Sequence, residues 1–434
     1  MADFNFKKWN LILGWFAFLI AFIAYSLTVE PTVSFWDAGE YILTSSKLQV
    51  GHPPGAPFFQ MMGAFFSIFA TDPTQIGLMI NMMSASASAF TILFMFWSIV
   101  LLIKQVVNNN ESSKEQNIAI LGAAFVGSLS FAFTDSFWFN AVETEVYAMA
   151  TLIMAVLFYL GLRWGNEMFT PRGNKWLILI SFVVGLSFGV HFMGLLTIPA
   201  IGLIYYFKNY KTITVKNFVL ANLAGIAVLL FVFKLLAPNI LRYFSALEIF
   251  FVNSVGLPFN SGSIIAFVLL VGFIIFGISF TRKKNYVNLN TALLCITFVV
   301  VGFSSWLMLP IRANANVTVN ENNPSSAREL LAYYNLEQYP KTHLFYGPQF
   351  TDQYAGLDEN QPYIDDKPKY EKDKTLGKYV IVNDYKNGLQ HYNSKHASLL
   401  PRMWSSEHAE NYMMYSGFLD FSVKTDYQMQ NDLR

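Results

Sequence analysis

Charged residues are scarce in this chain of 434 residues. Asp, Glu, Lys and Arg together make up 13% of it and hydrophobic residues 54%, whereas a soluble domain carries about 25% charged residues. The net charge of +1 gives no indication of nucleic-acid binding. The charge is also uneven, because residues 311–434 hold 29 of the 57 charged side chains. We therefore expect a lipid-embedded domain over residues 1–311 and a polar, globular domain over residues 312–434.

Cysteine is limited to Cys295, which lies in an apolar run, so an internal disulfide is impossible. The sequence also lacks a Walker A loop, a GxGxxG motif, an HExxH motif and a Cys and His cluster with zinc spacing. These absences argue against a cytoplasmic nucleotide-using enzyme and against a zinc site.

Apolar runs recur at lengths suited to a bilayer, whose hydrocarbon core takes roughly 20 helical residues to cross. The first run, 11–27, lacks a cleavage site and is interpreted as a signal anchor. A run at 55–70 is too short to span, which favours a re-entrant or interfacial helix. Two short runs meet at Val190-His191, where we expect two helices to meet at a cavity. Nine spans are predicted: 10–28, 76–103, 118–134, 145–163, 176–190, 192–207, 217–236, 261–281 and 289–310.

The distribution of Lys and Arg orients these spans. Thirteen of the sixteen Lys and Arg residues before position 311 fall on the side of the N-terminus, and only Lys47, Lys234 and Arg242 fall on the other. Positive residues collect in cytoplasmic loops. The pattern predicts a multi-pass protein with a cytoplasmic N-terminus and an extracytoplasmic C-terminal tail. We expect the membrane to be a bacterial inner membrane.

Four ionisable residues follow the first span in the stretch FWDAGEYILTSSKLQVGHPPG, residues 35–55. Asp37 and Glu40 are three residues apart, so they share a face of a helix. The structural alternative is a solvated helix start with Ser34 as N-cap. The functional one makes Asp37 a general base at the mouth of an outward cavity. The HPPG turn, residues 52–55, also has two interpretations. Either it is a loop that ends one helix and starts the next, or it holds His52 over the same site as Asp37.

Further candidates lie in later outer segments. In AVETEVY, residues 141–147, one of Glu143 and Glu145 is expected to face protein or a cavity, and Glu143 shares a helix face with Tyr147 at i, i+4. The alternative is that both glutamates only cap the helix. His191 lies among glycines at the predicted joint, as a structural residue or a site residue. Arg312 follows the last span, either as a snorkelling interface anchor or as a clamp for an anion such as phosphate.

The motifs FWDAGEYI, GHPPGAPFFQMMG, AVETEVYA and GLSFGVHFMG resemble the protein O-mannosyltransferase-like family of the GT-C superfamily. That family includes bacterial proteins long catalogued as a domain of unknown function and a vertebrate enzyme that mannosylates plexin-type receptors. The resemblance covers residues 9–312. It implies a mainly α, GT-C-type helix bundle of about nine spans with an interfacial helix, followed by a small mixed α/β tail.

The resemblance also implies an inverting glycosyltransferase. Its donor is a polyprenyl-phosphate-linked sugar, mannose or a similar hexose, and its acceptor a hydroxyl of a protein Ser or Thr or of a glycan. Asp37 matches the first-loop base, Glu40 and His52 shape the site, and Arg312 holds the lipid phosphate. Glu143 or Glu145 matches a second-loop acid.

The acidic pair of the first loop is separated here as D-A-G-E, which makes a divalent metal doubtful, and no cofactor is assigned. Relatives often extend beyond this length, so the tail is interpreted as possibly incomplete. Two other classes stay open. A secondary transporter also places acids and broken helices around a cavity, and a non-catalytic subunit of an envelope assembly is the third possibility. The sequence does not specify the sugar, the acceptor or the oligomeric state.

Overall fold

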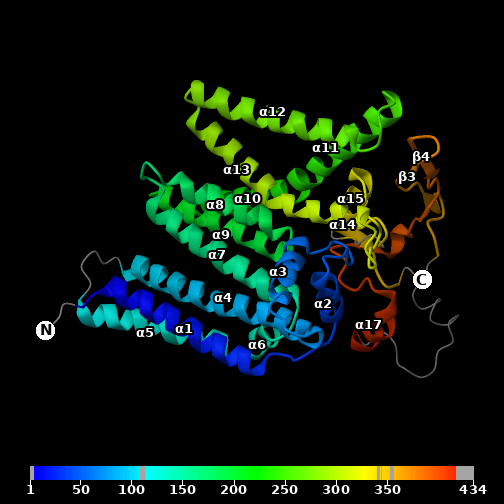
Figure 1. Ribbon diagram of the computed structural model, residues 1–434. Helices are drawn as coiled ribbons and strands as arrows, with labels where there is room; N and C mark the ends of the chain where they lie inside the picture. The colour runs from blue at the N-terminus through cyan, green and yellow to red at the C-terminus, as the bar shows by residue number, and fades with distance from the viewer. Residues whose placement is uncertain (1–3, 108–112, 340–342, 344, 352–355, 417–434) are drawn as a thin grey trace. The chain divides into compact units, whose positions relative to one another are not determined.

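The computed structural model describes residues 4–107, 113–339, 343, 345–351 and 356–416. The chain divides into two compact units. The helical unit comprises residues 1–248 and 262–336, and the tail unit comprises residues 249–261 and 337–434 (Figure 1). As the sequence predicts, the described part of the chain is mainly helical, and its named strands all lie in the tail unit.

Six helices are long and apolar enough to cross a membrane. They are α1 (Phe6–Thr28), Pro73–Val107 with α4 (Ile76–Val107), α7 (Val146–Glu167), Val215–Ser254, α12 (Ser261–Lys283) and Val287–Asn314. Two of them are composite. Val215–Ser254 joins α10 (Val215–Leu230), the π-helix η3 (Phe231–Leu236), α11 (Ala237–Ile249) and the π-helix η4 (Phe250–Ser254). Val287–Asn314 joins α13 (Val287–Phe303), η5 (Ser304–Leu307) and α14 (Met308–Asn314).

The sequence predicted nine spans, whereas the described residues supply six, or seven if the pair α5 (Lys114–Ala132) and α6 (Asp135–Ala141), bent by 70°, is one span. The other two predicted spans are short helices. They are α8 (Asn174–Ser187, 14 residues) and α9 (Thr197–Asn209, 13 residues), each shorter than a full crossing requires. The predicted break between them is confirmed, because His191 is the N-cap of the 3₁₀ helix η2 (Phe192–Leu196).

Small residues let these helices approach closely. Ala17 and Ala21 of α1 and Ala85 and Ala89 of α4 are fully buried in one cluster, as is typical of helix contacts in membranes. The crossing of α8 and α13 is tighter still. A Cβ added at Gly185 would lie 2.2 Å from the carbonyl oxygen of Val299, so only glycine fits there. The α13 residue Gly302 meets α8 in the same way.

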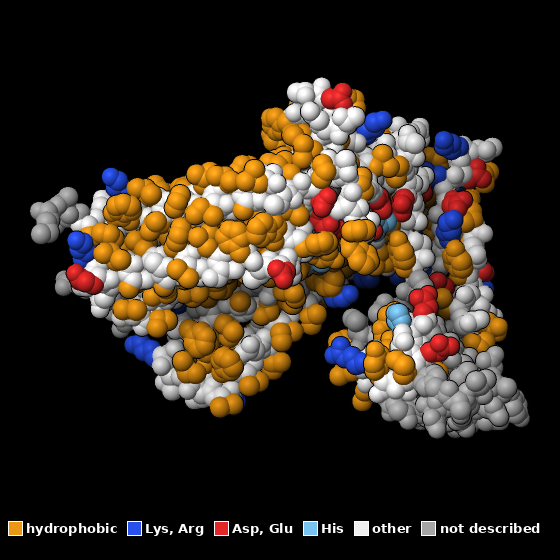
Figure 2. Space-filling view, turned by 90° about the horizontal axis from the view of Figure 1, so that it is seen from below, with side chains coloured by type: hydrophobic (Ala, Val, Ile, Leu, Met, Phe, Trp, Pro, Cys, Tyr) orange, Lys and Arg blue, Asp and Glu red, His pale blue; other side chains and the backbone are white. Residues whose placement is uncertain are grey.

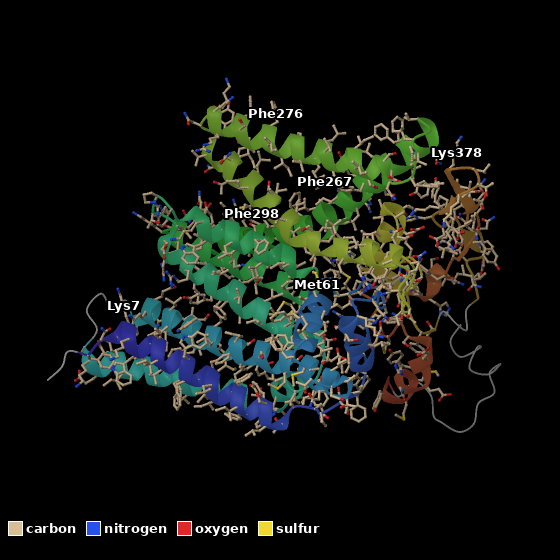
Figure 3. The ribbon with its side chains drawn as sticks, in the orientation of Figure 1. Lys7, Met61, Phe267, Phe276, Phe298 and Lys378 are labelled. Carbon is tan, nitrogen blue, oxygen red and sulfur yellow. The ribbon has the colours of Figure 1, made fainter. Side chains whose placement is uncertain are left out.

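The sides of the helical unit are covered by hydrophobic side chains, with Lys and Arg at the end where the chain begins (Figure 2). Phe267 and Phe276 of α12 are more than half exposed (Figure 3). An apolar surface of this extent matches lipid rather than water.

Three short helices gather toward the end of the bundle away from the start of α1 (Figure 1). They are α2 (Ala38–Ser46), α3 (Pro57–Ser67) and α15 (Ala327–Tyr334). Lys7 lies at one end of the bundle and Met61 of α3 toward the other (Figure 3). The short apolar helix expected after the HPPG turn is therefore present, beginning at Pro57 and ending at Ser67.

Residues 312–336 pack within the helical unit, although the sequence predicts a tail domain that begins at residue 312. Val50 and Asn320 form a parallel β-bridge, and Leu330, Leu331 and Tyr333 of α15 join the main hydrophobic core. The domain boundary at 311/312 stays a prediction. Residues of this segment contact the loop after α2 in the site described below.

The tail unit contains three antiparallel two-stranded sheets in its described part. The pairs are β1 (Tyr346–Pro348) with β6 (Ala397–Leu399), β2 (Tyr363–Ile364) with β5 (Leu389–Gln390), and β3 (Lys369–Asp373) with β4 (Lys378–Asn383). These short strands agree with the strand content of the mixed tail expected from the sequence. The side chain of Asn253 exchanges two hydrogen bonds with the backbone of Tyr379, at 2.8 and 2.9 Å, and this joins the segment 249–261 to β4. The helix α17 (Ala409–Ser416) follows.

Candidate active site

The loop before α2 sets the position of Asp37. Trp36 adopts a left-handed backbone conformation with φ of 57°, and Asp37 follows as the N-cap of α2. The interpretation with Ser34 as N-cap is therefore wrong, because the turn delays the first helical residue to Ala38. The Asp37 side chain makes no capping hydrogen bond within the described residues and is 59% exposed. Its carboxylate is thus open to solvent.

Glu40 and His52 form a close pair. The Oε2 atom of Glu40 lies 2.9 Å from Nδ1 of His52, and its Oε1 accepts the backbone N–H of His52 at 2.6 Å. The side-chain hydrogen bond between them raises the pKa of His52 and lowers the pKa of Glu40. Because Nδ1 faces Glu40, Nε2 is left toward Asp37, whose Oδ2 lies 3.9 Å away.

The HPPG turn holds His52 in this orientation. The backbone N–H of Gly55 donates to the carbonyl of His52 at 2.9 Å, and the hydroxyl of Tyr333 donates to the carbonyl of Gly51 at 2.6 Å. A Cβ added at Gly51 would lie 2.7 Å from Oε1 of Glu40. A larger residue at this position would displace the Glu40 carboxylate from its contacts with His52.

Glu145 joins the same cluster from the loop before α7. Its Oε1 accepts the backbone N–H of Asp37 at 3.1 Å, although 108 residues separate the two in sequence. The side chain is only 5% exposed. Burial, together with the negative charges of Asp37 and Glu143, raises the pKa of Glu145 to about 7.

Glu143, two residues before Glu145, is buried in the same loop. It is 2% exposed, and its Oε2 has no hydrogen-bond partner among the described residues. Burial raises its pKa, opposed by the nearby hydroxyl of Ser34. The predicted i, i+4 pairing of Glu143 with Tyr147 is wrong, because α7 begins only at Val146 with Glu145 as N-cap. Of the two glutamates, the structure brings Glu145 to Asp37.

A buried amide joins the two loops that carry Asp37 and Glu145. Asn81 of α4 donates to the carbonyls of Glu30 and Thr32 at 2.7 and 2.8 Å and accepts the hydroxyl of Thr144. The backbone N–H of Glu30 in turn donates to the carbonyl of Val142 at 2.9 Å. The loop that carries Asp37 is thereby fixed against the loop that carries Glu145.

Tyr147 and His191 form a second pair. Their ring centroids lie 5.4 Å apart, and Nδ1 of His191 accepts the backbone N–H of Met193 at 3.2 Å. Burial lowers the pKa of His191, which favours a neutral ring. The Tyr147 side chain is exposed. Both roles of His191, structural and substrate-binding, are compatible with this geometry.

Arg312 is held by backbone carbonyls of the loop between α2 and α3. Its Nε donates to the carbonyl of Leu48 at 2.5 Å and its Nη2 to the carbonyl of Lys47 at 3.1 Å. These bonds attach the end of α14 to the turn that follows α2. The anion clamp proposed from the sequence stays a prediction, whereas a role in holding this turn is visible in the contacts.

Sequence reasoning missed two residues beside His52. Tyr41 has its ring centroid 5.9 Å from that of His52, and its place one turn after Asp37 was the signal that could have revealed it. Glu321 donates its backbone N–H to the carbonyl of Val50 at 3.1 Å, and its carboxylate interacts electrostatically with Glu40 and His52. A separation of about 270 residues left no sequence signal for Glu321.

No group of three or more His, Cys, Asp and Glu side chains in the described part of the chain is arranged to hold a metal ion. A cavity of about 610 Å³ lies elsewhere in the helical unit, between the composite helix Val215–Ser254 and α12. Its lining is almost entirely apolar: Phe231, Leu235, Leu236, Asn239, Ile240, Tyr243, Leu269, Leu270 and Phe273. It is separate from the Asp37 cluster.

Comparisons with known proteins give this cluster a context. Residues 37–214 match the family described as the protein O-mannosyl-transferase TMEM260 N-terminal domain, a span that begins at Asp37 and includes Glu145 and His191. Residues 340–431 match a family of unknown function, DUF8416. No solved structure matches the chain.

The protein O-mannosyl-transferase tmem260 of Dictyostelium discoideum is 26% identical over 242 residues. That match covers 52% of this chain and 28% of the Dictyostelium protein. Residues 37–214 are thus similar to the N-terminal domain of the TMEM260 protein O-mannosyl-transferases, and the match spans less than a third of the Dictyostelium protein.

Proposed function

We propose that this protein is a GT-C-type membrane glycosyltransferase. It transfers mannose or a similar hexose from a polyprenyl-phosphate donor to a hydroxyl, that of a protein Ser or Thr, on the extracytoplasmic face. The observation that carries the proposal is the Asp37 carboxylate, which is 59% exposed and lies 3.9 Å from the imidazole of His52. Asp37 also begins the segment that matches the transferase family.

Asp37 acts as the general base. The acceptor hydroxyl gives its proton to the Asp37 carboxylate while its oxygen bonds to the anomeric carbon of the sugar. The bond between that carbon and the phosphate oxygen breaks, and polyprenyl phosphate leaves with the electron pair. Because the acceptor oxygen attacks from one face of the sugar and the phosphate leaves from the opposite face, the configuration at the anomeric carbon is inverted. Positioned proton transfer of this kind contributes about 10²–10⁴-fold to a rate.

His52 supports this base. Its Nδ1 is engaged by Glu40 at 2.9 Å, and the raised pKa that results favours the imidazolium. The positive charge then lies beside the Asp37 carboxylate, 3.9 Å from its Oδ2. The same charge can stabilise the negative charge that develops on the departing phosphate.

Glu145 positions the base from the second loop. It accepts the backbone N–H of Asp37 and therefore fixes the N-terminal end of α2. Tyr147 and His191, which pack ring against ring, continue this side of the site and are proposed to contact substrate. Glu143 supports the loop from inside the protein.

The apolar cavity between Val215–Ser254 and α12 suits the isoprenoid chain of the donor. On α12 it is lined by Leu269, Leu270 and Phe273, which lie near the middle of a 23-residue helix. This is the depth at which a lipid chain is buried.

We further propose nine membrane segments, with α8 and the η2–α9 pair as two short ones meeting at His191. Lys104 lies 3.5 Å above the ring of Phe6, so the basic end of α4 and the start of α1 share one end of the bundle. The Asp37 cluster follows the other end of α1. With the basic end cytoplasmic, Asp37 is extracytoplasmic.

The test is sugar transfer in membranes from a radiolabelled polyprenyl-phosphate sugar to an acceptor protein. Asp37→Asn keeps the size of the side chain and removes the base, so we expect transfer to fall by about 10²-fold or more. The matched control is Asp135→Asn, an exposed carboxylate at the start of α6, which should retain wild-type transfer.

Near-wild-type transfer by a well-expressed Asp37→Asn protein would refute the assignment of the base. Absence of transfer by the wild-type protein would favour the transporter or the non-catalytic subunit instead. The two outcomes are separable because the wild type and both variants are assayed together.

A further inference from the structure

The first outer loop is attached to residues 312–333 by a series of hydrogen bonds. Arg312 holds the carbonyls of Lys47 and Leu48, and the hydroxyl of Tyr333 holds the carbonyl of Gly51. Between these two anchors, segment 319–321 runs beside Gln49 and Val50. The attachment is therefore continuous from the end of α2 to the turn that carries His52.

The central part of this attachment is the parallel β-bridge between Val50 and Asn320. The backbone N–H of Val50 donates to the carbonyl of Val319 at 3.0 Å, and the N–H of Glu321 donates to the carbonyl of Val50 at 3.1 Å. The N–H of Val319 donates to Oε1 of Gln49 at 3.1 Å. Val50 is fully buried. The backbone of Glu321 is thus fixed two residues from His52.

The geometry points to Glu321 as a further positioning residue of the site, one that acts through His52. This inference rests on the proposed function for its catalytic meaning, although the pairing itself does not. The family match ends at residue 214, so this residue comes from outside the matched segment.

Four groups face the His52 ring from the elements around it. Among the described residues, Glu40 contacts Nδ1, Asp37 lies near Nε2, and the Tyr41 ring centroid is 5.9 Å away. The Glu321 carboxylate interacts electrostatically with the ring, and its backbone is held at Val50, two residues before His52. Three of the four are carboxylates. A cation surrounded in this way keeps its proton to higher pH than an isolated histidine.

The chemical consequence concerns the charge beside Asp37. With Glu40 and Glu321 ionised, His52 stays protonated, and Asp37 keeps a cationic neighbour across the working pH range. Without Glu321, His52 loses its proton at lower pH. The alkaline limb of the transfer rate should then move to lower pH, while the rate at the acid side stays close to that of the wild type.

The experiment measures His52 directly, in the full-length protein. Diethyl pyrocarbonate acylates only neutral imidazole, so its rate on the His52 peptide, followed by mass spectrometry across pH, reports the protonation of this side chain. In Glu321→Gln we expect the ratio of neutral to protonated His52, at a fixed pH within the transition, to rise about threefold. Glu321→Asp, which keeps the charge, should restore at least part of the wild-type midpoint.

The matched control is Glu329→Gln. Glu329 lies in the same segment, where its carboxylate accepts the hydroxyl of Ser325 at 2.8 Å, and it should leave the His52 midpoint unchanged. An unchanged midpoint in a folded Glu321→Gln protein would overturn the inference. So would an equal change in Glu329→Gln, since it would indicate a general effect of charge or folding.

The acylation readout does not depend on sugar transfer. If the wild type transfers no sugar but the midpoint moves in Glu321→Gln, the proposed function fails and the coupling of Glu321 to His52 stands. If transfer occurs and the His52 midpoint does not move, the proposed function stands and the coupling of Glu321 to His52 fails. In an active protein, the pH profile of transfer then tests the catalytic meaning, and a profile identical to that of the wild type would overturn it.

Discussion

Replacing Glu145 by Gln separates the charge of this side chain from its hydrogen bond. A Gln carbonyl can accept the backbone N–H of Asp37 as Glu145 does at 3.1 Å. What it cannot do is ionise in a site where the carboxyl is 5% exposed. The substitution therefore tests the cost of a buried negative charge with little change in shape.

The pKa of Glu145 is raised from 4.5 to about 7. At 1.36 kcal/mol per pH unit this difference corresponds to about 3 kcal/mol, and solvent screening near the protein surface reduces it to about 2 kcal/mol. Below pH 4.5 the carboxyl is neutral in both states and costs nothing. Between this pH and about 7 only the unfolded state loses the proton, so the stability of the folded state falls as pH rises.

Glu145→Gln removes this loss. Its unfolding midpoint should equal that of the wild type near pH 4.5 and exceed it at pH 8, by the equivalent of about 2 kcal/mol. The assay is thermal unfolding in detergent, followed by tryptophan fluorescence at both pH values. Asp135→Asn, an exposed carboxylate, is the control and should show the wild-type pH dependence. Equal pH dependence in wild type and Glu145→Gln would refute the reasoning.

Two further substitutions test the turn and the cavity. Gly51→Ala places a Cβ 2.7 Å from Oε1 of Glu40, so we expect sugar transfer to fall at least tenfold. Thermal unfolding, measured on the same protein, should show that it stays folded. Unchanged transfer would show that the turn tolerates movement. Leu270→Trp fills part of the 610 Å³ cavity. The KM for the lipid-linked donor should therefore rise severalfold, with little change in kcat. A change in kcat without a change in KM would indicate that the lipid binds elsewhere.

The local features of the site could be read from the sequence. The turn residues around His52 and the carboxylates at Asp37 and Glu40 belong to one short stretch, in which turn chemistry and helical spacing limit the possible arrangements. The break at His191 was also predictable, because two short apolar runs meet there. In each case the residues that decide the outcome are neighbours along the chain.

The choice between Glu143 and Glu145 could not be made in this way. Helical spacing favoured the pairing of Glu143 with Tyr147, but α7 begins at Val146. The start of α7 depends on the loop contacts that tie Thr144 to Asn81 of α4, a residue 63 positions earlier. Helix boundaries are poorly specified by local sequence for this reason.

The candidate membrane helices could be recognised from the sequence, because long apolar runs can bury their backbone in lipid only as helices. The distribution of Lys and Arg predicts how the loops are sorted between two sides. The bond from Arg312 to the loop after α2, 264 residues away, and the electrostatic contact of Glu321 with His52 follow only from the tertiary structure. Such contacts depend on the path of the whole chain, because the free energy that selects them comes from packing between distant segments rather than from the preferences of adjacent residues.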